Sequence, residues 1–261
     1  MNNSITLQKT LLKEVELNGV GLHTGKQVKL KFVPAPVNTG FVFVRTDVTP
    51  NVKIPADIQY VINTDRGTNL EKDNYKIQTS EHVLAALVGM DVDNCFIELD
   101  ESESPIMDGS SKFFVEAIES AGVVEQSERR CEYVVTEIIS YRDEETGSEI
   151  TLIPSDTFQV TTMVDFQTKV LGTQNASLDN ITDFKNEIAP ARTFSFLHEL
   201  EMLLENGLIK GGDLNNAIVY VDKPLSESNM ERLKEAFGKE KISVSPNGIL
   251  DNLSLHYSNE A

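Results

Sequence analysis

The sequence contains little cysteine and no long apolar run. Its two cysteines, Cys95 and Cys131, belong to no CxxC pair. This gives no support to a disulfide framework or a zinc ribbon, so we interpret both as structural thiols in a reducing compartment. No apolar segment is long enough to span a bilayer, and the N-terminal residues lack the features of a signal peptide. The sequence therefore predicts a cytoplasmic protein that is not integral to a membrane.

Basic residues are also scarce. The 261-residue chain has 23 Lys and Arg against 41 Asp and Glu, a formal net charge of −18. Nucleic-acid binding requires a basic face, so this balance argues against a nucleic-acid partner. If the substrate is a phosphate ester, a few local cations must bind it against an unfavourable overall field.

The first half of the chain predicts strands and two helices. Alternation predicts a strand at Val28–Phe32, and further strands follow at Phe41–Val44 and Cys95–Leu99. A helix is predicted from Glu81 to about Val88, and a second over Lys112–Ser120. The first is capped by Thr79 or Ser80, and its buried face is expected to be Val83, Leu84, Leu87 and Val88. The second ends before Gly122 and is expected to bury Phe113, Phe114, Ala117 and Ile118.

The second half repeats this order and then departs from it. A polar break at Ser127–Arg130 is the candidate linker, which divides the chain into domains 1–126 and 131–261. Strands are expected at Tyr133–Ile139, Glu149–Ile153, Phe158–Val164 and Ala217–Val221, with a helix from about Phe196 to Glu205 that stops at Gly207. A short helix at Met230–Phe237 follows. No closing amphipathic helix is predicted, so we expect the second domain to be incomplete and to expose apolar sheet surface.

The chemical signals that come from single segments are weak. The four histidines form no pair at i, i+4, because Ala86 stands four residues after His82. His82 is either a functional residue or a histidine at a helix start beside an acid. The glycine-rich segment 19–25 lacks the Lys-Ser/Thr ending of a phosphate-binding loop and favours a hairpin turn. Pro105–Ser110 is typical of a turn and helix cap.

Taken together and in order, these segments are far more specific. The chain resembles the family of UDP-3-O-acyl-N-acetylglucosamine deacetylases from near its start to its last residue. The matching segments are Leu17–Gly25 (LNGVGLHTG), Pro34–Pro36 with Asn38–Gly40, Arg45–Asp47, Thr79–Leu87 (TSEHVLAAL), Pro105–Ser110 (PIMDGS), Ala191–Phe196 (ARTFSF) and Gly207–Val219.

The resemblance implies an α/β fold of two related domains, in which sheets and helices form separate layers as in α+β proteins. Each would be a β-sheet packed on a helix pair, with the active site between the two. It also implies zinc-dependent hydrolysis of the 2-acetamido group of UDP-3-O-acyl-N-acetylglucosamine, which releases acetate in lipid A biosynthesis. The implied cofactor is Zn²⁺, which polarises the amide carbonyl and activates water.

Residue roles follow from the same resemblance, position by position. His82 matches a zinc ligand, Glu81 the general base and Thr193 the residue that stabilises the oxyanion. The substrate-binding matches are Phe194 at the sugar, Asp165 and Phe166 at the uracil end, and Leu200, Ile209, Leu214, Ala217 and Val219 around the acyl chain. For these last apolar residues a core role is an equal alternative. His23 and Asp108 are interpreted as structural, and Arg66-Gly67-Thr68 replaces more apolar residues of some members.

The resemblance also implies ligands that this sequence does not show. The family places its other two zinc ligands in a His-Lys-x-x-Asp helix, which is expected beyond Ala261, together with a further histidine. His256 aligns with a non-ligand. Two hypotheses follow. Under the first, the chain is an N-terminal fragment of a deacetylase, which in some bacteria is fused to a downstream acyl-carrier-protein dehydratase. Under the second, it is a non-catalytic remnant that binds a UDP-sugar.

Overall fold

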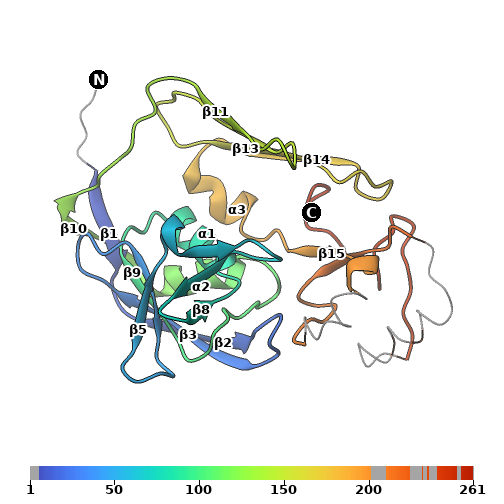
Figure 1. Ribbon diagram of the computed structural model, residues 1–261, viewed down its shortest axis with the longest axis horizontal. Helices are drawn as coiled ribbons and strands as arrows, with labels where there is room; N and C mark the ends of the chain where they lie inside the picture. Colours follow the sequence, from blue (N-terminus) through green and yellow to red (C-terminus); the bar gives the residue numbers. More distant parts are fainter. Residues whose placement is uncertain are drawn as a thin grey trace.

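A computed structural model describes residues 6–200, 210–223, 231, 234, 240–251 and 254–260. The first half is built on a five-stranded sheet (Figure 1). Its strand order is β2 (Val15–Val20), β3 (Gln27–Pro34), β9 (Cys95–Leu99), β4 (Phe41–Arg45) and β5 (Val52–Pro55). The central strand β9 runs parallel to β4 and antiparallel to β3. The strands predicted at β3, β4 and β9 are confirmed, and the glycine-rich segment 19–25 forms the end of β2 and the turn toward β3.

Two helices cover this sheet, as the sequence predicted. They are α1 (Glu81–Gly89) and α2 (Lys112–Ala121), and Gly122 follows α2 as its cap. The expected buried faces were partly wrong. Val88 is 45% exposed and Phe113 is 37% exposed, while Ala86 and Val115 are buried instead. Each helix therefore turns a neighbouring stripe of its surface toward the core.

The proposed linker at Ser127–Arg130 is wrong as a description of local structure. Residues up to Arg129 belong to strand β10 (Val123–Arg129), which pairs antiparallel with β1 (Leu7–Leu11). Arg130 then forms ion pairs with Asp91 at 2.7 Å and with Asp93 at 2.8 Å. The polar residues suggested a break because a strand at a sheet edge keeps polar side chains in water.

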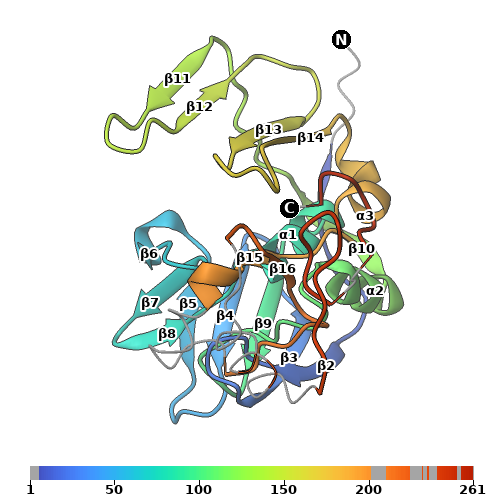
Figure 2. The ribbon, with the colours of Figure 1, turned by 90° about the vertical axis from the view of Figure 1, so that its right-hand side faces the viewer.

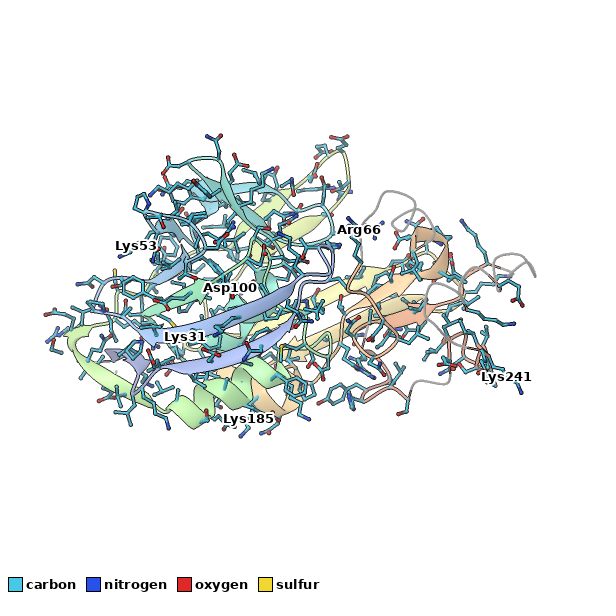
Figure 3. The ribbon with its side chains drawn as sticks, turned by 90° about the horizontal axis from the view of Figure 1, so that it is seen from below. Lys31, Lys53, Arg66, Asp100, Lys185 and Lys241 are labelled. Carbon is cyan, nitrogen blue, oxygen red and sulfur yellow. The ribbon has the colours of Figure 1, made fainter. Side chains whose placement is uncertain are left out.

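A small sheet lies between β5 and α1 along the chain. It consists of β6 (Val61–Asn63), β7 (Asn69–Lys72) and β8 (Tyr75–Ile77), preceded by the 3₁₀ turn η1 (Ile58–Tyr60). The loop between β6 and β7 contacts the start of α1, where Thr68 is hydrogen-bonded to Ser80 and Glu81. It carries Arg66, which lies where the first half meets the helical residues 197–200 (Figure 3).

The second half contributes two hairpins and one parallel strand pair (Figures 1 and 2). The hairpins are β11 (Ile139–Arg142) with β12 (Glu149–Leu152), and β13 (Val160–Asp165) with β14 (Thr173–Leu178). The parallel pair is β15 (Phe194–Phe196) with β16 (Ile218–Tyr220). Between them lie η2 (Ile181–Asp183) and α3 (Phe184–Glu187). The expected strand Tyr133–Ile139 is wrong, because only Ile139 lies in a strand. Most of its apolar residues are exposed, including Tyr133 at 84%.

The second half also enters the core of the first. Phe184 of α3 is 7% exposed and belongs to the same apolar cluster as the inward faces of α1 and β9. Its ring occupies the space that a Cβ at Gly89 would need. Helix α1 therefore ends on a glycine where α3 makes its close approach.

The mixed α/β class predicted from the sequence is confirmed by this arrangement, while the division into two related domains stays a prediction. Residues 197–200 are helical, as expected. The remainder of that helix, its stop at Gly207 and most of the predicted helix at 230–237 lie outside the described residues. Among the helices that the structure describes, none has the length and apolar character needed to cross a bilayer.

Candidate active site

Glu81 and His82 open helix α1. The Glu81 side chain sits in the first turn, where the helix dipole favours a negative charge. Its Oε2 accepts a hydrogen bond of 2.8 Å from the Thr68 amide, and its Oε1 lies 4.0 Å from Nε2 of His82. The carboxylate therefore stands between the 63–68 loop and the imidazole, with one oxygen held and the other turned toward His82.

The His82 side chain is only 17% exposed. Burial lowers the pKa of the imidazole, against the opposing influence of the carboxylates of Glu81 and Asp108. The ring is therefore neutral at neutral pH, which is the form that ligates a metal. The Ser111 hydroxyl, at the start of α2, donates to the His82 carbonyl at 3.0 Å and ties the two helices together.

The Pro105–Ser110 segment is a turn, as predicted; its Asp108 acts electrostatically on His82, and its Gly109 is hydrogen-bonded to Thr193. Asp108 accepts hydrogen bonds from the Ser110 amide at 3.1 Å and from its hydroxyl at 2.6 Å. Gly109 has φ +85°, and a Cβ there would overlap the carbonyl oxygen of Asn216. This close approach lets the Thr193 amide donate to the Gly109 carbonyl at 2.7 Å.

Thr193 is held on its other side by β16, because the Ile218 amide donates to the Thr193 carbonyl at 2.9 Å. The three residues predicted to do chemistry, Glu81, His82 and Thr193, therefore lie around one turn. This grouping joins the first and second halves of the chain.

An aromatic cluster adjoins Thr193. The Phe194 and Phe166 rings meet edge to face with centroids 5.1 Å apart, and Tyr220 lies 5.9 Å from Phe194. The structure thus brings together two of the residues predicted to bind the substrate. Asp165 is exposed at the end of β13, where its carboxylate accepts the Gln167 amide at 3.0 Å.

Three of the residues predicted to surround the acyl chain, Leu200, Leu214 and Val219, are found in a core cluster. Leu200 and Leu214 are each 6% exposed and pack with Leu197, Val219 and Leu250. Leu22, from the turn between β2 and β3, is partly buried against this cluster. The described contacts of Leu200 and Leu214 are those of core residues. Ile209 lies outside the described residues.

His23, interpreted as structural, belongs to a turn held by a buried acid that the sequence reasoning did not single out. The Glu103 carboxylate accepts hydrogen bonds from the His23 and Thr24 amides, both at 2.8 Å, and from the Thr79 hydroxyl at 3.1 Å. Its side chain is completely buried. Two further pairs were missed, Arg66 with Glu199 and Arg192 with Glu260. No local pattern reveals such pairs, because each joins residues far apart in the chain.

The residues that the structure describes do not form a complete zinc site. His82 is one candidate ligand, and no group of three or more His, Cys, Asp or Glu side chains in this part of the chain could hold a metal ion. A catalytic zinc takes three protein ligands and an open position. The described residues therefore do not account for zinc by themselves. The two cysteines are free; Cys95 is buried and Cys131 is exposed.

Residues 8–242 match the family model described as LpxC: UDP-3-O-acyl N-acetylglycosamine deacetylase. The chain belongs to this family. It is 44% identical over 256 residues to the bifunctional enzyme LpxC/FabZ of Chlorobaculum tepidum, covering 97% of this chain and 55% of that relative. The UDP-3-O-acyl-N-acetylglucosamine deacetylase of Chromohalobacter salexigens is 42% identical over 239 residues, which are 90% of this chain and 78% of the relative.

Membership of the LpxC family confirms the resemblance drawn from the ordered motifs. The chain spans about half the length of the bifunctional LpxC/FabZ relatives it matches. The matched region is 55% of the Porphyromonas gingivalis protein, as it is of the Chlorobaculum tepidum protein. The matched region contains Glu81, His82, Asp165, Phe166, Thr193 and Phe194. Their individual roles in this LpxC chain stay predictions.

Proposed function

We propose that this chain carries the deacetylase chemistry of the LpxC family and hydrolyses the acetamido group of UDP-3-O-acyl-N-acetylglucosamine in lipid A biosynthesis. The observation that carries the proposal is the grouping of Glu81, His82 and Thr193 around the Pro105–Ser110 turn. The names of the relatives support the substrate class, and the geometry supports the reaction type.

Glu81 is the proposed general base. Its Oε2 is held by the Thr68 amide, which leaves Oε1 to take a proton from the attacking water. The water oxygen bonds to the carbonyl carbon of the acetamido group, and the carbonyl oxygen becomes an oxyanion that the Thr193 hydroxyl stabilises. The carbon–nitrogen bond then breaks and the nitrogen takes up the proton, which gives acetate and a free amine.

Aromatic and apolar residues are proposed to hold the substrate. Phe194 would lie against the sugar, with Phe166 packed on its ring. Asp165, exposed at the end of β13, would meet the uracil end. The acyl chain is proposed to enter beside Leu200, Leu214 and Ile209, although the first two are already packed into an apolar cluster.

His82 is the only described residue that we propose as a zinc ligand. When bound, a catalytic zinc polarises the carbonyl of the amide. The described residues supply one of the three ligands that such an ion needs, and we assign no further ligand. A longer protein with a fused 3-hydroxyacyl-acyl-carrier-protein dehydratase is proposed as the context, which the names of the bifunctional relatives support.

The test measures acetate release from the UDP-sugar substrate, zinc content and UDP-sugar binding on the same preparation. Glu81→Gln is expected to lower turnover by roughly 100-fold or more, because it removes the base and keeps the shape. Glu116→Gln on the exposed face of α2 is the matched control and should be fully active. If the wild-type protein binds the UDP-sugar but shows no turnover, the deacetylase proposal is rejected. The result would then favour the alternative, a non-catalytic protein that binds a UDP-sugar.

A further inference from the structure

A buried ion pair joins the residue before Thr193 to the end of the described chain. The Glu260 side chain is 0% exposed and that of Arg192 is 9% exposed. Removing a carboxylate and a guanidinium from water is costly unless the two are paired and hydrogen-bonded. A pair this deeply buried is therefore expected to be tightly organised.

The hydrogen bonds of Glu260 meet that expectation. Oε1 accepts from Nε of Arg192 at 2.7 Å and from its backbone amide at 3.2 Å. Oε2 accepts from Nη2 of Arg192 at 3.2 Å and from the His256 amide at 2.6 Å. Burial by itself raises the pKa of Glu260, but the Arg192 hydrogen bonds and the His256 amide outweigh it. The net pKa is lowered, and the carboxylate stays ionised.

Glu260 thus accepts hydrogen bonds from both the backbone amide and the side chain of Arg192. Nη2 of Arg192 also donates to the Ser254 carbonyl at 2.8 Å, so the guanidinium bridges two points of the 254–260 segment. That segment is itself anchored, because the Tyr257 hydroxyl donates to the Asn186 carbonyl at 2.7 Å. Figure 2 shows the segment, in red, beside α3.

The consequence falls on Thr193, the next residue. Its amide is hydrogen-bonded to the Gly109 carbonyl and its carbonyl to the Ile218 amide, so the backbone just before β15 is held from two sides. The contacts of Arg192 with Glu260 and Ser254 hold the backbone immediately before Thr193. The aromatic cluster around Phe194 holds the backbone immediately after it.

We propose that Glu260 is a positioning residue for Thr193: by holding Arg192 it sets the place of the Thr193 hydroxyl at the oxyanion. The proposal rests on the proposed function in so far as it gives Thr193 that role. An oxyanion donor works only when it is placed within a few tenths of an ångström. Loss of the Arg192–Glu260 ion pair therefore slows the chemical step and leaves substrate binding nearly unchanged.

The first measurement is steady-state deacetylation by variants of the full chain. Glu260→Gln keeps the shape and removes the charge, and it is expected to lower kcat roughly ten-fold at an unchanged KM. Glu260→Ala also removes the acceptor and should lower kcat further. Asp47→Asn is the matched control, because it breaks another bidentate arginine–carboxylate pair away from the site. It should leave kcat unchanged.

The second measurement is backbone amide exchange, which needs no activity. The Thr193 and Ile218 amides are expected to exchange about ten-fold faster in Glu260→Gln than in the wild type. The Ile97 amide, in the centre of the five-stranded sheet, should not change. Equal effects at Thr193 and Ile97, or the same kcat loss in Asp47→Asn, would overturn the positioning role. If the wild type shows no turnover, the deacetylase proposal fails, and amide exchange still tests whether Glu260 holds the backbone at Thr193 in place.

Discussion

Arg45 and Asp47 show what a bidentate pair contributes when it lies away from the site. Arg45 donates from Nε and Nη2 to the two carboxylate oxygens of Asp47, at 2.8 and 2.6 Å. Its Nη1 donates to the Lys76 carbonyl at 2.9 Å, which joins β4 to β8. The Arg45 side chain is 9% exposed and that of Asp47 is 29% exposed. The pair is therefore shielded enough to stabilise the fold.

We expect Asp47→Asn to lower the free energy of unfolding by about 1 kcal/mol at neutral pH. The Arg45 guanidinium holds the pKa of Asp47 below its ordinary 3.8. A carboxylate whose pKa is lowered by folding stabilises the protein above the unfolded pKa. That stabilisation is lost as the pH falls through the folded pKa. Urea unfolding at a series of pH values should show the two proteins converging in acid. A constant difference at every pH would contradict the ion-pair account.

At this scale the sequence predicted residues that belong to motifs and missed residues that depend on tertiary contact. Glu81, His82 and Thr193 were proposed from family motifs, and the structure places them around one turn. Glu260 stands 68 positions from Arg192, and no periodicity or spacing connects them. Glu103, which holds the His23 turn, was missed for the same reason.

Secondary elements were predictable where one face of the element is buried along its whole length. Strand β9 has a regular buried and half-buried alternation, and α2 carries a strong apolar stripe. The prediction failed at β10, because its partner β1 lies at the other end of the first half. It also failed at Tyr133–Ile139, where a run of β-prone residues finds no described partner strand before Ile139.

The loop before β7 shows how one element can be coupled to another. Nη1 of Arg66 donates to Glu199 at 2.9 Å, and so joins the loop that holds Glu81 to the helical residues 197–200. This hydrogen bond raises the pKa of Arg66 and lowers that of Glu199, with burial opposing both.

We expect a double-mutant cycle of Arg66→Ala and Glu199→Ala to give a coupling of about 0.5 kcal/mol in low salt. The value is small because the side chains are 40% and 24% exposed and solvent screens them. High salt should remove most of it. Unfolding free energies of the four proteins at two ionic strengths measure the coupling. Strictly additive losses in low salt would show that the two residues do not interact.

Across the whole molecule, the β11–β12 hairpin stands out as amphipathic but exposed (Figure 1). Its register pairs Ile139 with Leu152 and Tyr141 with Ile150, so these four side chains share one face. The other face is polar and includes Ser140 and Thr151. Tyr141 is 68% exposed and Ile150 is 66% exposed. The second half of the chain therefore exposes an apolar sheet face at this hairpin, whereas Ile218 and Tyr220 of β16 are buried.

An apolar sheet face of this kind favours self-association, whereas the formal net charge of −18 opposes it. The charge repulsion is screened by salt and the apolar attraction is not, so we expect association to increase as salt is added. Sedimentation at several concentrations and ionic strengths measures the balance.

Replacing Tyr141 and Ile150 together by Thr should suppress this association. Threonine keeps the strand propensity of the hairpin, so the melting temperature should hardly change. Leu12→Thr is the matched control, because Leu12 is 66% exposed and lies in the connection between β1 and β2, outside the hairpin face. It should leave the association as it is in the wild type. A wild-type protein that stays monodisperse in high salt would mean that the hairpin face is too small, or too well shielded by nearby charge, to bind a second copy.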